Sequence, residues 1–258
     1  MTRIVTSRTA IIGIMAIAVL SARSVEAASP GEQAIAEAAQ NNKFTYIMFY
    51  KSNDAASKQM HGTLMNALSQ RTDATIVSID TGNRQEEGLI RQFDASRLPM
   101  PAVAVLAPNG AVCSVIPRQI NEQQVLACII SPVQATCLKS LQENKLVALC
   151  VLPNPQAKIP QGVANFKGDK HYAERTRVIP VLAGDQKEAK FLKQLQIPTD
   201  KSTPVVAFIA PPGVMVGMFD EHVTAIELAE NLAASGKCCE DENCKHNQTA
   251  GSGAPKRR

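Results

Sequence analysis

Hydrophobic and polar positions along the chain switch between helical and strand spacing, and the same order of elements is predicted twice. In the first repeat of this order, Ala34, Ile35 and Ala38 recur at helical spacing before a run rich in β-branched and aromatic residues. Ser52-Asn53-Asp54 offers N-cap chemistry for the next helix, which extends to about Gln70. The complete pattern predicts helices at 31–42, 55–70, 85–93 and 121–130, and strands at 45–50, 74–79, 102–106 and 111–116.

The second repeat follows the same order of elements. Its pattern predicts helices at 132–143, 185–195 and 224–234, and strands at 146–152, 177–182, 205–209 and 214–219. The one departure is 153–175, a stretch rich in proline and lysine that predicts irregular structure. Each repeat is a β-α-β unit followed by a hairpin and a final helix. This order gives a mixed sheet with helices on both faces.

Repeated sequence supports two copies of one domain. Ser29-Pro30 is repeated at Ser131-Pro132, an offset of 102 residues, and Pro101–Gly110 is repeated at Pro204–Gly213, an offset of 103. The helices that follow the Ser-Pro pairs also end alike, at 40–43 and 142–145. A period of this size indicates duplicated domains, at 29–130 and 131–235, because solenoid repeats are shorter, about 20–50 residues.

The two ends of the chain differ in character from the repeats. Arg3 and Arg8 precede the apolar stretch Ala10–Ala22, and Val25-Glu26-Ala27 is typical of a cleavage site. We therefore predict a signal peptide at 1–27 and export to the periplasm or the extracellular space; an uncleaved membrane anchor is the alternative. Residues 236–258 are polar and predict a disordered tail that contains cysteine.

The charge argues against two classes of partner. The formal charge of +4 falls to +2 when the signal peptide is removed, because three arginines and one glutamate leave with it. A nearly neutral chain without a basic block does not predict binding to nucleic acid, or to a membrane after signal cleavage.

The order of elements resembles the thioredoxin superfamily. The resemblance is carried by a strand that runs into a capped helix, a second strand before an amphipathic helix, an X-Pro pair before each third strand and a hairpin turn: Ile47–Tyr50, Val77–Asp80 with Leu89 and Phe93, Met100-Pro101, Thr203-Pro204 and Asn109-Gly110. It implies an α/β fold of two tandem thioredoxin-like domains, each a mixed central sheet flanked by helices.

The redox chemistry of that family is missing. Thioredoxin-like redox enzymes carry Cys-x-x-Cys where the helix after the first core strand begins, because a helix N-terminus lowers the pKa of the attacking thiol. The matching stretches, Asp54–Ser57 and Pro153–Pro160, contain no cysteine. We therefore predict no catalytic residue; Asp54 and Ser57 are interpreted as an N-cap and a first-turn residue rather than as an acid and a nucleophile.

The X-Pro pairs are the predicted binding residues. In the resembled family the equivalent proline is cis, and the residues around it offer backbone groups to extended peptides. The resemblance therefore implies cis-proline loops that bind a protein or peptide partner at Met100, Pro101, Thr203 and Pro204. The alternative is that each proline only sets the turn into a core strand.

Seven cysteines in an exported chain suggest disulfides or a metal site. Cys128 and Cys137 flank the junction between the repeats and form a candidate bridge across it, whereas Cys113 and Cys150 lie in predicted strands and fit packed thiols. In the tail, the candidate ligands for Zn²⁺ or Cu(I) are Cys238, Cys239, Cys244 and His246. A small disulfide knot, which the exported setting favours over a metal site, and a free oxidisable tail are the alternatives.

Two functional hypotheses result. The first is an exported, redox-inactive thioredoxin-like scaffold that binds protein or peptide and needs no cofactor. The second is a thiol-based metal-binding or redox protein that acts through the tail cysteines.

Overall fold

The computed structural model describes residues 28–237, which form two α/β units joined at 129–131. In domain 1 (29–130) the elements are α1 (Pro30–Gln40), β1 (Phe44–Tyr50), α2 (Ala55–Leu68), β2 (Ala74–Asp80), the 3-10 turn η1 (Arg84–Glu86), α3 (Glu87–Gln92), the 3-10 turn η2 (Ala95–Arg97), β3 (Ala102–Leu106), β4 (Val112–Pro117) and α4 (Glu122–Ala127). In domain 2 (131–237) they are α5 (Pro132–Gln142), β5 (Leu146–Leu152), α6 (Gln161–Gly168), β6 (Thr176–Leu182), α7 (Ala189–Gln194), β7 (Val205–Ala210), β8 (Val214–Phe219) and α8 (Ala225–Lys237).

The two sheets have the same topology. Their strand orders are β2-β1-β3-β4 and β6-β5-β7-β8. In each sheet the first two strands are parallel, because a helix connects them, and the last three are antiparallel. Even a β-bulge is repeated, between Val105 and Leu106 in one sheet and between Phe208 and Ile209 in the other. The prediction of two tandem thioredoxin-like domains is confirmed.

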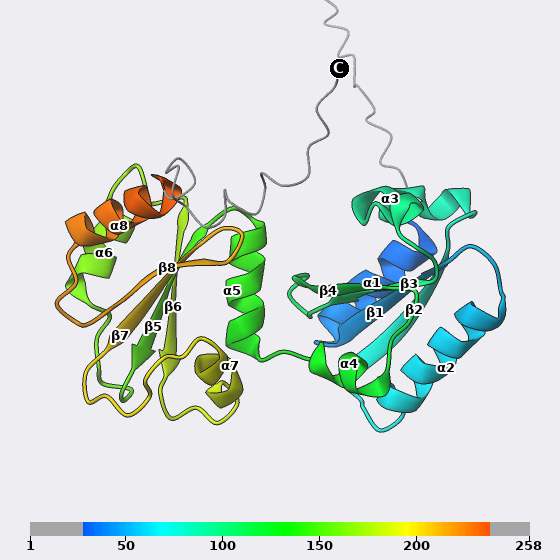
Figure 1. Cartoon of the computed structure of the whole chain (residues 1–258), viewed down its shortest axis with the longest axis horizontal. Helices are drawn as coiled ribbons and strands as arrows, with labels where there is room; N and C mark the ends of the chain where they lie inside the picture. Colours follow the sequence, from blue (N-terminus) through cyan, green and yellow to red (C-terminus); the bar gives the residue numbers. More distant parts are fainter. Residues whose placement is uncertain (1–27, 238–258) are drawn as a thin grey trace, which may run out of the picture.

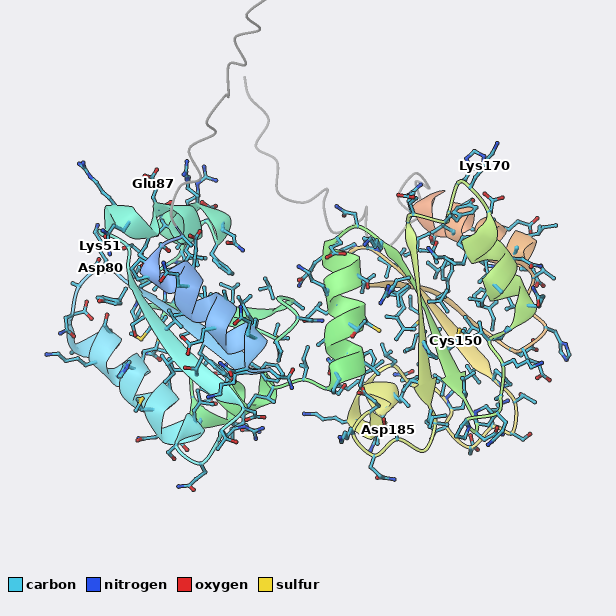
Figure 2. All side chains as sticks on the ribbon, turned by 180° about the vertical axis from the view of Figure 1, so that it is seen from behind. Lys51, Asp80, Glu87, Cys150, Lys170 and Asp185 are labelled. Atoms are coloured by element: carbon cyan, nitrogen blue, oxygen red, sulfur yellow. The ribbon has the colours of Figure 1, made fainter. Side chains whose placement is uncertain are left out.

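Side chains along the central strands point alternately to the two faces of the sheet, and they build a core on each face of each sheet. In β1, Tyr46 and Met48 pack with α2 and α4, whereas Ile47 and Phe49 pack with α1 and α3. In domain 2, the cluster that contains Cys150 packs with α6 and α8, and the opposite face packs with α5 and α7. Figure 1 shows these layers, and Figure 2 shows Cys150 within domain 2.

The interpretation of 153–175 as irregular is wrong in part, because α6 lies within it. Pro160 occupies the N-cap position of α6, where its missing N–H costs no helical hydrogen bond. Val163 and Phe166 then face the sheet at helical spacing. The three prolines before the helix concealed it, although they end where it begins.

The expectation of two cis-proline loops is confirmed in domain 1 and wrong in domain 2. Met100–Pro101 is cis, but the other cis bond among residues 28–237 is Pro211–Pro212, so Thr203–Pro204 is trans. An X-Pro pair in the sequence does not set the isomer, because the two forms differ by only about 0.5–1 kcal/mol and the surrounding structure selects one of them.

The described part of the chain also bears on the membrane question. Between residues 28 and 237, no helix combines the length and the apolar run that a bilayer crossing requires. The predicted signal peptide lies outside the described residues.

Candidate functional site

The stretch that replaces Cys-x-x-Cys caps α2. The Asp54 carboxylate accepts hydrogen bonds from the backbone N–H of Ser57 at 2.9 Å and from the Ser52 hydroxyl at 2.8 Å. The Ser57 N–H, followed by the Ser52 hydroxyl, lowers the pKa of Asp54. A carboxylate held in its ionised form as an N-cap is a poor general acid, so the geometry supports the interpretation of Asp54 as a cap.

A cavity of about 480 Å³ opens beside this helix in domain 1. It lies between α2 and the loop that leads from β4 to α4, and its walls are Ala56, Gln59, Met60, Thr63, Arg118, Gln119, Ile120, Asn121 and Gln124. Arg118 has a left-handed backbone (φ 67°), and its N–H donates a hydrogen bond to the Pro101 carbonyl at 2.7 Å. The cavity and the cis-proline loop are thereby joined, although neither Met100 nor Pro101 lines the cavity.

Domain 2 has a cavity of about 480 Å³ at the equivalent end of its sheet. Ser202 and Pro204 form one wall, and residues from 153–161 form another. Glu221 and His222 complete it. The structure therefore places Pro204 at a cavity, and Thr203 between two of its lining residues.

Neither cavity holds an assembled acid–base or nucleophilic group. In domain 1, the Thr63 hydroxyl is committed to the Gln59 carbonyl, to which it donates at 3.1 Å. In domain 2, His222 is 85% exposed and approaches Glu221 at 3.7 Å, and it makes no hydrogen bond to Ser202. A nucleophile needs a base within about 2.6–3.2 Å, itself held by a third group, and no lining residue meets this requirement.

The domain 1 cavity has a definite polarity. Arg118 is the one charged residue in its lining, and Gln59 and Gln119 add side-chain amides that can both donate and accept hydrogen bonds. A peptide backbone presents the complementary donors and acceptors. Such a lining fits an extended segment that is neutral or acidic.

The predicted bridge between Cys128 and Cys137 is wrong, because both thiols are free and belong to different cores. Cys128 packs in domain 1 beside Val125, whereas Cys137 points into the cluster of Leu141 and Val147 in domain 2. Adjacent helices in the sequence suggested proximity, but the opposite facing of the two side chains prevents it.

Burial also makes the described thiols unreactive. Desolvation raises the pKa of Cys113, Cys137 and Cys150 to about 12, and it raises the pKa of Cys128. The thiolate is the nucleophile and the metal ligand, so these groups are protonated and inert near neutral pH. The prediction of packed thiols at Cys113 and Cys150 agrees with this.

The predicted metal ligands Cys238, Cys239, Cys244 and His246 lie outside the described residues. Within 28–237, no group of three or more His, Cys, Asp or Glu side chains is placed to hold a metal ion.

Sequence reasoning missed all of the residues that line the domain 1 cavity. Gln59 and Thr63 are ordinary polar positions on a helix, and Arg118 is an isolated cation in a loop. Their one shared signal is position: Gln59 and Thr63 lie in the capped helix, and Arg118 directly follows the last hairpin strand. That signal becomes visible only once the topology is known.

No protein-family model matches the sequence, and the search of curated proteins found no match. Among solved structures, human ERp44 form II is 11% identical, with a TM-score of 0.34, over 79% of this chain and 55% of that one. The first two thioredoxin domains of Saccharomyces cerevisiae Eps1p are 11% identical, with a TM-score of 0.29, over 74% and 89%.

A disulphide isomerase from Xylella fastidiosa is 20% identical, with a TM-score of 0.27, over 37% of this chain and 82% of that one. Similarity at this level does not indicate an activity for this chain. The strand order and strand directions support the thioredoxin-like fold of each domain, and the repeated bulge marks the two domains as alike.

Proposed function

We propose that the chain is an exported, non-catalytic scaffold that binds extended protein or peptide segments through its thioredoxin-like domains. The observation that carries the proposal is the domain 1 cavity, which is open and polar, adjoins the cis-proline loop and holds no nucleophile–base pair. The unreactive body thiols support a role without redox chemistry.

Binding is tested with a reduced, carboxymethylated unfolded polypeptide as the probe, titrated calorimetrically into the full chain. Thr63→Arg places a long side chain in the cavity and should weaken binding about tenfold, because this side chain fills space that the bound segment would occupy. The substitution does not change the core. Met65→Arg, on an exposed position of the same helix, is the matched control and should leave the affinity unchanged. Equal affinities for the parent and Thr63→Arg would contradict the proposed site.

Absence of catalysis is tested separately, by disulfide reductase and isomerase assays. The full chain is compared with a chain that ends at Lys237, which lacks the tail cysteines. We expect no turnover from the shortened chain. Turnover that survives the truncation would place redox chemistry in the two domains and would overturn the non-catalytic role.

A further inference from the structure

Among residues 28–237, nothing covers the apolar outer edge of β8, whereas α5 covers the equivalent edge in domain 1. Val112 in β4 pairs with Leu106 and Met215 in β8 pairs with Ile209, each beside the repeated bulge, so Val112 and Met215 are equivalent. Ala111 is fully buried, but Val214 at the matching position is 49% exposed and Met215 is 36% exposed. An exposed apolar edge strand is a template for association.

Domain 1 shows how such an edge is closed. The Gln142 side chain, at the end of α5, accepts a hydrogen bond from the Val112 N–H at 2.9 Å and donates one to the Val112 carbonyl at 2.8 Å. Ala135 and Leu138, from the same face of α5, join the core of domain 1. The helix that begins domain 2 thus occupies both backbone groups of the edge strand and buries the apolar side chains around them.

The helix that begins domain 1 carries the same device. Gln40 stands where α5 has Gln142, at the start of the repeated Gln-x-Asn-Lys ending. Its side chain is exposed and makes no hydrogen bond within residues 28–237. Ala36, also exposed, stands where α5 has Leu138. At this position the sizes are complementary, because Ala36 is smaller than Leu138, whereas Val214 and Met215 are larger than Ala111 and Val112. Gln33, which is exposed and polar, stands where α5 has Ala135.

We propose that the chain associates head to tail with a second copy of itself, α1 of one copy docking on β8 of the next. Gln40 then bonds to the backbone of Met215 as Gln142 bonds to Val112 within one chain. Because the two surfaces differ, a dimer has a free α1 on one copy and a free β8 on the other. Further copies can therefore add at both ends. This interface is separate from the cavities of the proposed peptide site.

The test uses two variants, each blocked on one surface, and sedimentation velocity on the full chain expressed with its own N-terminus. Ala36→Arg blocks α1 and Met215→Glu blocks β8. We expect the parent to grow in size with concentration and each variant alone to remain a monomer. An equimolar mixture should form a heterodimer and stop there, because the Ala36→Arg copy supplies a free β8 and the Met215→Glu copy a free α1.

A milder variant tests the amide itself. Gln40→Ala removes two hydrogen bonds and should weaken self-association about tenfold. Met65→Glu places the same charge as Met215→Glu on an exposed methionine of α2 and should leave association unchanged. A parent that is monomeric at all concentrations overturns the proposal. Association of Ala36→Arg alone, with Met215→Glu monomeric and no heterodimer in the mixture, also overturns it and indicates pairing of β8 with β8.

Discussion

A buried carboxylate fixes the start of the first helix in each domain. Glu86, only 4% exposed, accepts hydrogen bonds from the Ser29 hydroxyl at 2.7 Å and from the Gly31 N–H at 3.0 Å. Glu188 accepts the equivalent pair from Ser131 and Val133. The sequence separation is 57 residues in both pairs of serine and glutamate. A helix N-terminus favours negative charge, so each carboxylate is stabilised where it is buried.

We expect Glu86→Ala to lower the free energy of unfolding by about 2 kcal/mol, because two donors at the start of α1 lose their buried acceptor. Glu87→Ala is the matched control. Glu87 lies on the outside of α3 (Figure 2), and its ion pair with Arg91 is exposed, so the effect should stay within about 0.5 kcal/mol. Urea unfolding of both variants measures the difference. Equal effects would mean that the Glu86 contacts contribute nothing specific.

The buried thiols predict a loss of stability at alkaline pH. Burial raises the pKa of Cys113, Cys137 and Cys150 to about 12 in the folded chain, against about 8.5 in the unfolded chain. Their contribution to stability is complete below the unfolded pKa and is lost as the pH rises towards 12, because the unfolded chain releases its protons first. Each of these three thiols then lowers the free energy of unfolding by about 1.4 kcal/mol per pH unit.

Cys150→Ala isolates one thiol from the lysines and tyrosines that titrate in the same range. Urea unfolding under reducing conditions, between pH 9 and 11, should give the variant the shallower slope, by about 1.4 kcal/mol per pH unit. Parallel curves for the parent and the variant would show that burial does not raise the pKa of the Cys150 thiol.

At the level of elements, periodicity predicted every strand of both sheets, because each central strand is a buried run and each edge strand follows a clear turn. The run Leu146–Leu152 and the turn at Asn109-Gly110 are examples. Helix α6 was not predicted because it follows a stretch with three prolines. The trans isomer of the Thr203–Pro204 bond was not predicted for another reason. The isomer depends on tertiary surroundings, which the X-Pro dipeptide alone does not reveal.

The candidate site was predictable only in part. The sequence located the X-Pro pairs and the absence of cysteine at the helix start, because both are local features. It did not locate the cavity, whose walls combine Gln59 and Thr63 with Arg118, about 55 residues further along the chain. None of these side chains has a chemistry that marks it in advance.

Close packing of α6 gives a prediction at the same scale. A Cβ at Gly162 would lie 1.9 Å from the Val223 carbonyl oxygen, so Gly162→Ala must displace either α6 or the loop before α8. Overpacking of this kind costs about 1–3 kcal/mol. Gly168→Ala, at the other end of α6, meets nothing within 4 Å and should be neutral or slightly stabilising. Thermal unfolding of the two variants compares them, and similar melting temperatures would contradict the tight contact.

Across the whole molecule, α5 is the element that joins the domains. Its Cys137 and Leu141 belong to the core of domain 2, whereas Ala135 and Leu138 belong to that of domain 1. Figure 1 shows the helix between the two sheets. The sequence predicted a domain boundary before this helix and suggested a disulfide as the connection. The connection is instead apolar packing and one glutamine side chain, which carries no signal in a sequence.

The weight of that glutamine in joining the domains can be measured. Gln142→Ala removes both hydrogen bonds to Val112, so the Val112 amide should exchange with solvent about tenfold faster and the free energy of unfolding should fall by about 1 kcal/mol. Glu143→Ala is the control, because Glu143 pairs with Lys139 and Lys145 inside domain 2. Amide exchange followed by NMR reports both variants. Unchanged exchange at Val112 in Gln142→Ala would mean that the apolar face of α5 alone holds β4, and that an amide at this helix position does not define how one domain recognises the next.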